Sequence, residues 1–348
     1  MLEETLTLLG SNGQSDICVV SGIFDRAVDT ISEIFSPSRV HIVTDSTVAP
    51  LYLSKLEEQF TLPVTHSIIP AGERQKNLET ISNLYHDFLA AGLTRKDLVI
   101  ALGGGVTGDI TGFAAATCMR GLPLCQIPTT LLAQVDSSVG GKTGVDLPEG
   151  KNLVGAFYQP RLVLIDPQVL STLPRSIFAD GMAEVVKYGY IANPDILDMA
   201  LHTDDVSNLE RMIYSCVKIK RDVVAIDEHD TGLRMILNFG HTIGHAVEKL
   251  GNYTDLTHGQ AVAIGMAAAM RLSALLGNES LEPQLISLLQ KIGLPYKLEY
   301  DREEIYQALL TDKKKFGGIV NFILVRQPGQ AEIMPLKADI LHELIRQL

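Results

Sequence analysis

Short runs of β-branched and apolar residues alternate with helical patterns over the first half of the chain. The segment 1–10 is interpreted as the first strand. Further strands are predicted at Ile17–Val20, Val40–Thr44, Val64–Ile69, Leu98–Leu102, Leu124–Ile127 and Leu162–Ile165. Between them lie stretches such as Asn77–Ala91, whose apolar residues recur at i, i+3 and i+4. This alternation predicts βα units, a mostly parallel sheet and a three-layered α/β architecture.

Helical periodicity replaces the strands after Asp166-Pro167. Helices are predicted at Ile177–Tyr190, Val206–Asp227, Ile243–Leu250, Ala261–Leu276 and Leu281–Ile292, with a late hairpin of Ile319–Val325 and Ala331–Met334. Pro174 lies in a loop with the turn chemistry of a boundary. We therefore expect an α/β domain over 1–174 and a predominantly α-helical domain over 175–348, with a site between them.

Composition narrows the class of protein. The 348 residues include 29 Lys and Arg against 41 Asp and Glu, for a net charge of −12, which disfavours nucleic acid as a partner. The apolar segment Ala261–Met270 is shorter than the ~20 residues that cross a membrane, and the N-terminus lacks the basic region of a signal peptide. Four cysteines without a CxxC pair fit reduced thiols. A soluble cytoplasmic protein is expected.

A run of three glycines follows the predicted strand at Leu98–Leu102. The pattern Gly103-x-Gly105-x-x-Gly108 matches the dinucleotide fingerprint, in which glycines let the backbone approach a pyrophosphate. No acidic residue stands about 20 residues downstream to hold the ribose. Asp45, at the end of another strand, is a substitute. The pattern indicates a Rossmann-like fold with a non-standard nucleotide site, although a tight strand–helix turn alone would also use these glycines.

A second glycine-rich stretch, SSVGGKTGVD, places Lys142 beside paired glycines, and Lys151 follows in EGKN. In an acidic protein, two lysines in what we interpret as glycine-rich loops favour an anionic substrate. Lysines exposed on turns are the alternative.

Three of the nine histidines lie close together in the helical half. His241 and His245 are four residues apart, so on a helix both face one side, and His258 follows. Neutral imidazole is a common ligand of divalent metals, and Glu184, an acid among apolar residues, could complete a site. Spacing alone favours His241 and His245 as ligands and leaves His258 open.

Seven motifs occur in order between about residues 40 and 325: GGGVTGD, IPTTLLAQVDSSVGGKTGVD, GKNLVGAFYQP, GMAEVVKYG, GLRMILNFGHTIGHAVE, HGQAVAIGM and DKKK. Together they resemble the 3-dehydroquinate synthase family. The resemblance implies a two-domain lyase that uses NAD and zinc or cobalt to convert 3-deoxy-D-arabino-heptulosonate 7-phosphate into 3-dehydroquinate and phosphate. It implies transient oxidation, elimination of phosphate, re-reduction, ring opening and aldol closure.

The resemblance also implies residue roles. The metal ligands would be Glu184, His241 and His258, which moves His245 to a proton relay. NAD contacts would be Asp45, Glu73, Lys76, Gly104, Gly105, Val106, Asp109, Thr129, Thr130, Lys142, Lys151, Thr172 and Leu173. Substrate contacts would be Asp136, Lys142, Lys151, Asn152, Lys187, Lys220, Arg234, Asn238, His245 and, among Lys313 to Lys315, Lys314. Arg120 would reach the substrate phosphate of a neighbouring subunit, which implies a homodimer.

Alternatives stay open at this point. Sister sugar-phosphate cyclases would share the NAD and metal machinery, but Lys220, Arg234 and Asn238 favour a substrate with a carboxylate. A metal-dependent glycerol or alcohol dehydrogenase would not need the phosphate-binding lysines, and a non-catalytic nucleotide-binding protein would need neither the histidines nor Glu184. Gln260 stands where the family usually has Glu, which bears on the surroundings of His258.

Overall fold

The computed structural model describes residues 5–11, 13–252, 254–313 and 319–348. In that part of the chain, contacts divide the molecule into two compact units, which we describe separately. Unit 1 comprises residues up to Pro174 together with Lys220–His229, and unit 2 comprises Arg175–Ile219 and the chain from Asp230 onward. The chain first passes from unit 1 to unit 2 after Pro174, where the sequence predicts the domain boundary. The sequence predicts only this one boundary, whereas residues Lys220–His229 belong to unit 1 again.

Unit 1 is built on a mixed sheet with strand order β1-β2-β9-β6-β5-β3-β4 among the described residues. The strands are β1 (Thr5–Gly10), β2 (Gly13–Val19), β3 (Val40–Asp45), β4 (Val64–Ile69), β5 (Leu98–Gly103), β6 (Leu124–Pro128) and β9 (Leu162–Ile165). Only the pairing of β1 with β2 is antiparallel in this sheet. The mostly parallel sheet predicted from the β-branched runs is confirmed.

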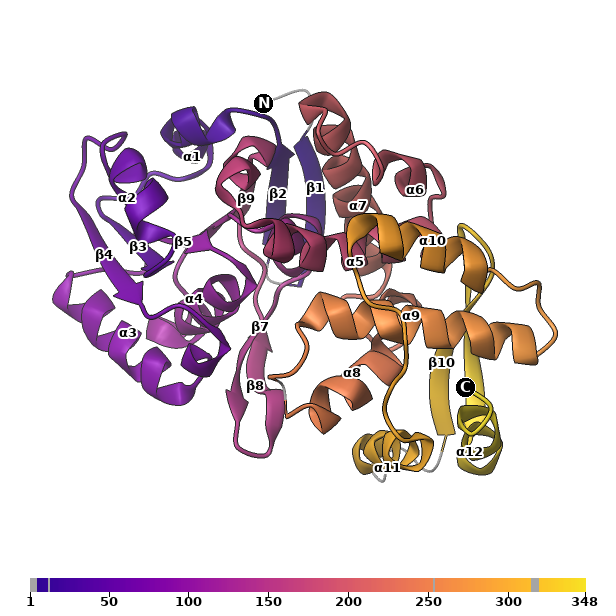
Figure 1. The fold of residues 1–348 in the computed structure, drawn as a ribbon. Coiled ribbons are helices and arrows are strands. Elements are labelled where there is room, and N and C mark those ends of the chain that lie inside the picture. Colours follow the sequence, from indigo (N-terminus) through magenta and orange to yellow (C-terminus); the bar gives the residue numbers. More distant parts are fainter. Residues whose placement is uncertain (1–4, 12, 253, 314–318) are drawn as a thin grey trace. The chain divides into compact units, whose positions relative to one another are not determined.

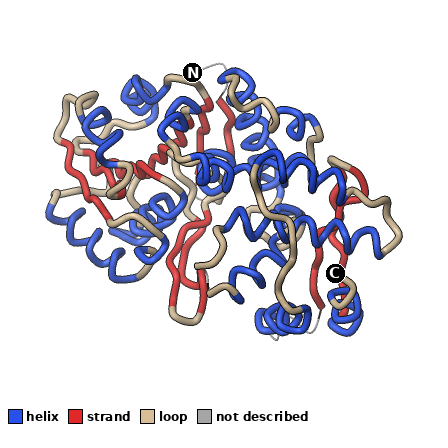
Figure 2. The backbone as a smooth tube through the Cα atoms, in the orientation of Figure 1, coloured by secondary structure: helices blue, strands red, loops and turns tan. Residues whose placement is uncertain are grey.

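Helices cover both faces of this sheet (Figure 1; strands red and helices blue in Figure 2). They are α1 (Ala27–Ile34), α2 (Ala49–Glu57), α3 (Leu78–Ala90) and α4 (Gly105–Thr117). Ile42 packs in a core with residues of α1 and α2, whereas its neighbour Val43 packs with residues of α3 and α4. Consecutive residues of β3 therefore pack into two separate cores, one on each face of the sheet. This explains why the central strands are apolar throughout and do not alternate between apolar and polar residues.

Short elements complete unit 1. The 3₁₀ segments are η1 (Ile23–Arg26), η2 (Glu73–Gln75), η3 (Cys118–Arg120) and η5 (Pro167–Thr172), and a π-helical turn, η4, spans Ala133–Ser137. A separate antiparallel hairpin joins β7 (Lys142–Leu147) to β8 (Gly150–Phe157). The helix α7 (Val206–Ile226) begins in unit 2 and ends in unit 1.

Unit 2 is predominantly helical, as predicted. It contains α5 (Arg175–Ile191), α6 (Asp195–Met199), η6 (Leu233–Asn238), α8 (His241–Leu250), α9 (His258–Leu275), α10 (Glu282–Ile292), α11 (Arg302–Lys313) and α12 (Ala338–Ile345). The predicted hairpin is present as β10 (Ile319–Gln327) and β11 (Gln330–Lys337), with a bulge after Val325. One core joins Ile243 and Val247 of α8 to Leu272 of α9 and Phe322 of β10.

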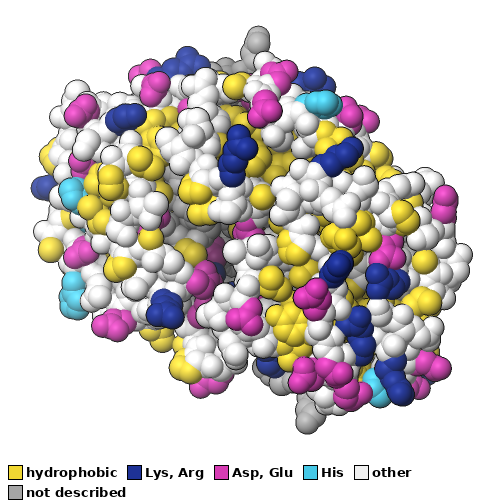
Figure 3. Space-filling view, viewed as in Figure 1, with side chains coloured by type: hydrophobic (Ala, Val, Ile, Leu, Met, Phe, Trp, Pro, Cys, Tyr) yellow, Lys and Arg dark blue, Asp and Glu magenta, His cyan; other side chains and the backbone are white. Residues whose placement is uncertain are grey.

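The visible surface mixes charges of both signs. In Figure 3, Lys and Arg side chains lie scattered among Asp and Glu side chains and exposed apolar residues. In the described part of the chain, no helix combines the length and apolar character needed to span a bilayer.

Candidate active site

The order of strands in unit 1 reverses between β3 and β5. The chain passes from β3 to β4 on one side, then returns across β3 to β5, β6 and β9 on the other. In open α/β sheets, ligands bind at the carboxyl ends of the strands at such a reversal. Asp45 ends β3 and Gly103 ends β5, so the sequence-predicted acid and glycine run both stand at this edge.

Asp45 is tied to the start of α4. Its Oδ2 accepts a hydrogen bond from Thr107 Oγ1 at 3.1 Å, and its Oδ1 accepts from the backbone N–H groups of Thr47 at 2.8 Å and Val48 at 3.1 Å. The carboxylate is thereby fixed beside the glycine turn.

Packing explains the three glycines of that turn. A Cβ at Gly103 would lie 2.7 Å from the Thr107 side chain, at Gly104 3.0 Å from that of Thr130, and at Gly105 2.9 Å from Ser137 Oγ. The tight-turn explanation is therefore sufficient for the glycines themselves. Because α4 begins at Gly105, its first N–H groups also form an anion-binding end next to Asp45.

A buried lysine links three segments of unit 1. Lys76 Nζ donates to Asp109 Oδ2 of α4 and to Asn152 Oδ1 of β8, each at 2.6 Å. Burial raises the pKa of Asp109, and Lys76 offsets part of this effect. Burial would lower the pKa of Lys76, but Asp109 and Glu73 together raise it. The ammonium is therefore a fixed positive charge between a predicted NAD residue and a predicted phosphate residue.

The second glycine-rich stretch is a hairpin rather than the two loops interpreted from sequence. Lys142 begins β7 and is exposed, and Lys151 lies in β8 and is half-buried. Gly144 pairs with Gly155 across the hairpin, and Cβ atoms there would lie 2.5 and 2.1 Å from carbonyl oxygens of the opposite strand. These glycines serve close strand pairing, which a sequence pattern cannot distinguish from loop flexibility.

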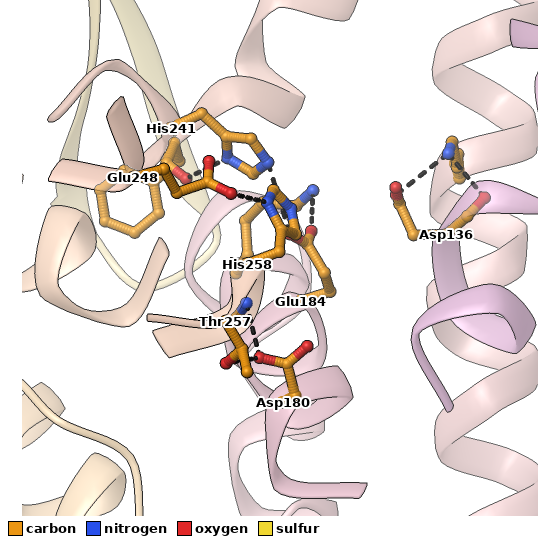
Figure 4. Close-up of polar contacts among 11 residues, drawn as sticks. Asp136, Asp180, Glu184, His241, Glu248, Thr257 and His258 are labelled. Atoms are coloured by element: carbon orange, nitrogen blue, oxygen red, sulfur yellow. Dashed lines mark hydrogen bonds and ion pairs between the residues drawn. The ribbon is translucent and has the colours of Figure 1, made fainter. Parts of the chain in front are cut away.

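Lys220 and Asp136 are paired within unit 1. Lys220 Nζ donates to the backbone oxygen of Asp136 at 2.6 Å and lies 3.0 Å from its Oδ1 (Figure 4). Lys220 is buried and Asp136 lies in the π-helical turn. The structure thus brings together two residues predicted to contact substrate.

The three predicted metal ligands of unit 2 lie together, with His241 and His258 both next to Glu184 Oε1 (Figure 4). Glu184 Oε1 lies 3.4 Å from His241 Nε2 and 3.4 Å from His258 Nε2. Its Oε2 contacts Lys187 Nζ, and both Glu184 and Lys187 are almost fully buried. The carboxylate comes from α5, and the imidazoles come from the first residues of α8 and α9.

The spacing of these atoms fits a bound metal ion. Atoms about 2.1 Å from a tetrahedral zinc ion lie about 3.4 Å apart, from the ordinary Zn–N and Zn–O distances. Both separations from Glu184 Oε1 match this value and exceed an ordinary hydrogen bond. His241 Nδ1 is 3.1 Å from the Phe239 carbonyl, which fixes the tautomer that presents Nε2 to a metal.

Electrostatics around the ligands also favour a cation. Burial alone would raise the pKa of Glu184, but Lys187 and His241 hold it well below its usual range. Burial would lower the pKa of His258, but the carboxylates of Glu184 and Glu248 raise it to about 10. Two carboxylates therefore stabilise positive charge at His258.

A second set of possible ligands shares His258. His245, Glu248 and His258 also lie within ligand reach of one another among the described residues, and no such set there contains both His241 and His245. His245 is exposed, and Glu248 Oε1 is 3.6 Å from His258 Nδ1. The set with the buried Glu184 matches a closed ligand shell better than this one.

Glycines allow the helices that carry the histidines to approach closely. Gly240 is the N-cap of α8 and has a φ of +81°. A Cβ at Gly265 of α9 would lie 1.9 Å from the carbonyl oxygen of Gly240. A Cβ at Gly244 would lie 3.0 Å from the Ala261 carbonyl oxygen. The glycines of the Gly-His-x-x-Gly-His motif therefore bring α8 against α9, so that His241 and His258 can share Glu184.

The remaining predicted residues are placed as follows. Thr129 is buried and its N–H donates to the Gly103 carbonyl at 2.9 Å, while Thr172 shares a 2.7 Å hydrogen bond with Tyr52 Oη and Leu173 ends η5. Arg234 is buried in η6, which Asn238 ends. Arg120 is exposed and adopts φ +67° directly after Met119 with φ +51°. Lys314 lies outside the described residues.

Sequence reasoning missed three side chains near His258: Asp180, Glu248 and Thr257. Asp180 precedes Glu184 by one helical turn on α5, so both project from one face. That spacing within ADGMAE was the available signal. Gln260 Oε1 accepts the Thr257 N–H at 3.1 Å, so it caps α9, a role that Gln and Glu can both fill.

Comparisons with known proteins agree with this geometry. Residues 66–180 match the family description 3-dehydroquinate synthase N-terminal, and residues 181–315 match 3-dehydroquinate synthase C-terminal. The chain belongs to the 3-dehydroquinate synthase family. Curated members include the 3-dehydroquinate synthases of Clostridium acetobutylicum, 42% identical over 97% of this chain and 98% of that one, and Pelobacter propionicus, 46% identical over 87% and 88%. The recognition made from seven motifs is confirmed.

Solved structures place the family among related cyclases. A 2-deoxy-scyllo-inosose synthase complexed with carbaglucose-6-phosphate, NAD⁺ and Co²⁺ is 29% identical, covers 99% of both chains and has a TM-score of 0.86. A 2-epi-5-epi-valiolone synthase from Streptomyces hygroscopicus with NAD⁺ and Zn²⁺ bound is 27% identical, covers 96% and 95%, and has a TM-score of 0.87. A probable glycerol dehydrogenase from Sinorhizobium meliloti, 15% identical with a TM-score of 0.63, shares the fold alone.

Proposed function

We propose that this chain converts 3-deoxy-D-arabino-heptulosonate 7-phosphate into 3-dehydroquinate and phosphate, a step of the shikimate pathway. The observation that carries the proposal is the convergence of Glu184, His241 and His258 at metal-ligand spacing in a chain whose two family matches are both to 3-dehydroquinate synthase.

Two bound groups are part of the proposal. Glu184, His241 and His258 would hold zinc or cobalt, and the reversal point beside Asp45 and Gly104 would hold NAD. When bound, NAD supplies a reversible hydride acceptor and the metal supplies a Lewis acid for a substrate alkoxide. Structures of two related cyclases contain NAD⁺ with Co²⁺ or Zn²⁺, which supports both assignments.

The cations of unit 1 and its hairpin suit an anionic substrate. We assign phosphate binding to Lys142, Asn152 and His245, and His245 is exposed and can exchange a proton. Lys76 fixes Asn152 by binding its Oδ1, so the amide presents its NH₂ donors to an incoming anion. Lys151 would contact both NAD and substrate.

Other predicted residues are assigned to the carboxylate and the hydroxyl groups of the substrate. Arg234 and Lys220 would bind the carboxylate, since Arg offers a bidentate fork and Lys a compact charge. Asp136 would accept hydrogen bonds from ring hydroxyls while paired with Lys220. Lys187, with Asn238, would address the same hydroxyls, and buried Lys187 is ion-paired with Glu184.

We further propose a homodimer in which Arg120 reaches the phosphate of the neighbouring subunit. Met119 and Arg120 hold consecutive left-handed backbone conformations, which cost free energy in residues with a Cβ, and this local strain supports a functional role for the turn. Arg95 Nε stabilises the turn by donating to the Met119 carbonyl at 3.0 Å. The four cysteines are buried and form no disulfide among the described residues, which fits the reducing cytoplasm we assign.

Phosphate release from 3-deoxy-D-arabino-heptulosonate 7-phosphate tests the reaction. With NAD and zinc, phosphate is expected to appear without accumulation of NADH, and a chelator is expected to stop it. Glu184→Gln, which removes one ligand charge at nearly constant shape, is expected to lose the zinc and the activity together. NADH that accumulates without phosphate release would replace the proposal by a dehydrogenase.

A matched substrate comparison addresses the sister cyclases. Glucose 6-phosphate, which lacks the carboxylate, is expected to release no phosphate at the same enzyme concentration. Turnover of glucose 6-phosphate in place of the sugar acid would assign the chain to a sister activity.

A further inference from the structure

The N-terminus of α9, where His258 is the first helical residue, is anchored by a carboxylate from another helix. Asp180 Oδ1 of α5 accepts hydrogen bonds from Thr257 Oγ1 and, at 2.7 Å, from the backbone N–H of Gly259. These two residues flank His258 directly. Figure 4 shows Asp180 and Thr257 side by side, with Glu184 and His258 above them.

The two helices are in backbone contact at this point. A Cβ at Gly259 would lie 2.0 Å from the Asp180 carbonyl oxygen, so only glycine permits the approach. The Asp180 carboxylate therefore acts as an N-cap supplied by a different helix, and its negative charge lies at the positive end of α9.

The same face of α5 carries both the anchor and a metal ligand. Asp180 and Glu184 are four residues apart on this helix, and one faces the backbone around His258 while the other faces its imidazole. We propose that Asp180 is a positioning residue for the metal centre, which holds the first turn of α9 in register with α5 so that His258 Nε2 meets Glu184.

His258 needs such an anchor because it lies in the first turn of α9. First-turn N–H groups have no partners within the helix, so helix ends open more readily than helix centres. Within α9 itself, a capping box pairs the Gln260 side chain with the Thr257 N–H and the Thr257 side chain with the Gln260 N–H, and neither contact involves the Gly259 N–H. Asp180 secures the Gly259 N–H and the Thr257 hydroxyl, and so restricts the backbone on both sides of the ligand.

Zinc affinity, measured by competition with a chromophoric chelator, tests the inference. Asp180→Ala is expected to raise the Kd for zinc by about 10- to 100-fold, the range for groups that orient metal ligands. Asp180→Asn keeps the acceptor oxygen and loses only the charge, so a rise of about two- to fivefold is expected. In the cobalt-loaded protein, the visible absorption of Asp180→Ala should shift, because ligand geometry changes.

Asp301→Ala is the matched control. Asp301 Oδ1 accepts the N–H groups of Glu303 at 2.9 Å and Glu304 at 3.1 Å at the start of α11, so its loss also uncaps a helix of unit 2. Its zinc Kd should stay within twofold of the parent. An unchanged zinc Kd in Asp180→Ala, or an equal rise in Asp301→Ala, would overturn the inference.

Two further variants keep the test decisive. If Asp180→Ala does not fold, Thr257→Val removes the hydroxyl that contacts Asp180 and caps the Gln260 N–H, and leaves the bond of Asp180 to the Gly259 N–H in place; a several-fold rise in Kd supports the inference and an unchanged Kd rejects it. The inference rests on the proposed function only in taking Glu184, His241 and His258 as ligands. If His258→Ala binds zinc as the parent does, the proposed metal centre itself fails, a result separate from an unaffected Asp180→Ala.

Discussion

His41 is a buried histidine whose neutral form is built into the core of unit 1. It lies on β3 with 1% of its surface exposed and packs edge-on against the Phe88 ring at 5.0 Å. Ser67 Oγ donates to Asp87 Oδ2 at 2.6 Å, so His41 Nε2 must donate to Ser67 Oγ at 2.9 Å. His41 Nδ1 is then left to accept from Thr65 Oγ1 at 2.8 Å. Every polar atom of the neutral ring is thus satisfied.

Protonation would disturb this network. Burial lowers the pKa of His41 to about 4, although Asp87 opposes the change. Because the folded pKa lies below the unfolded value of about 6.5, the neutral form stabilises the fold above pH 6.5, and this stability is lost as the pH falls toward 4. The lowered pKa of His41 means that the free energy of unfolding falls by about 2 kcal/mol when the pH is lowered to 5. The loss reaches about 3 kcal/mol well below pH 4.

Two measurements check this prediction. The imidazole proton resonance of His41, assigned by its disappearance in His41→Gln, is expected to titrate near pH 4. The loss of stability to urea between pH 8 and pH 5 is expected to be about 2 kcal/mol larger in the parent than in His41→Gln, because glutamine can donate to Ser67 without titrating. His86→Gln, at an exposed position of α3, is the control and should behave as the parent. A resonance that titrates near pH 6.5 would refute the reasoning.

Substitutions elsewhere test other contacts. His245→Ala is expected to retain zinc while His258→Ala loses it; metal analysis showing that both variants lose zinc would favour the ligand set of His245, Glu248 and His258. Gly259→Ala is expected to cost about 1–3 kcal/mol or more, because the added methyl meets a backbone oxygen; an unchanged Tm would contradict the close helix approach. Lys76→Met is expected to weaken NAD binding about tenfold and to lower Tm, because buried Asp109 loses its partner; calorimetry with NAD that shows parent affinity would reject this role.

The sequence predicted those strands and helices whose own pattern of apolar residues reflects which of their faces are buried. The strand Leu98–Gly103 is buried at every residue, and its continuous apolar run is what a strand covered on both faces requires. The hairpin of β7 and β8 escaped prediction because its residues are mainly glycines, charges and polar side chains. Its strands approach closely where Gly144 pairs with Gly155, and only the folded chain brings these two residues together.

The candidate metal centre also depends on contacts between separate helices, which local sequence patterns do not reveal. Sequence spacing links His241 with His245, because four residues make one helical turn. The structure instead places His241 and His258 against one oxygen of Glu184, and these residues belong to different helices. Such a set can be reached from sequence through the resemblance to the family, but not from periodicity.

The return of Lys220–His229 to unit 1 has a consequence for synthesis on the ribosome. Three contacts bind this segment to residues near the start of the chain and to η4: Arg221 Nη1 donates to the Thr7 carbonyl at 3.1 Å, the Ser11 N–H donates to Glu228 at 2.8 Å, and Lys220 pairs with Asp136. Unit 1 therefore cannot complete itself when residue 174 emerges from the exit tunnel. The nascent sheet must wait for about 55 more residues, roughly 3–11 seconds at ordinary elongation rates, during which its first hairpin lacks these contacts.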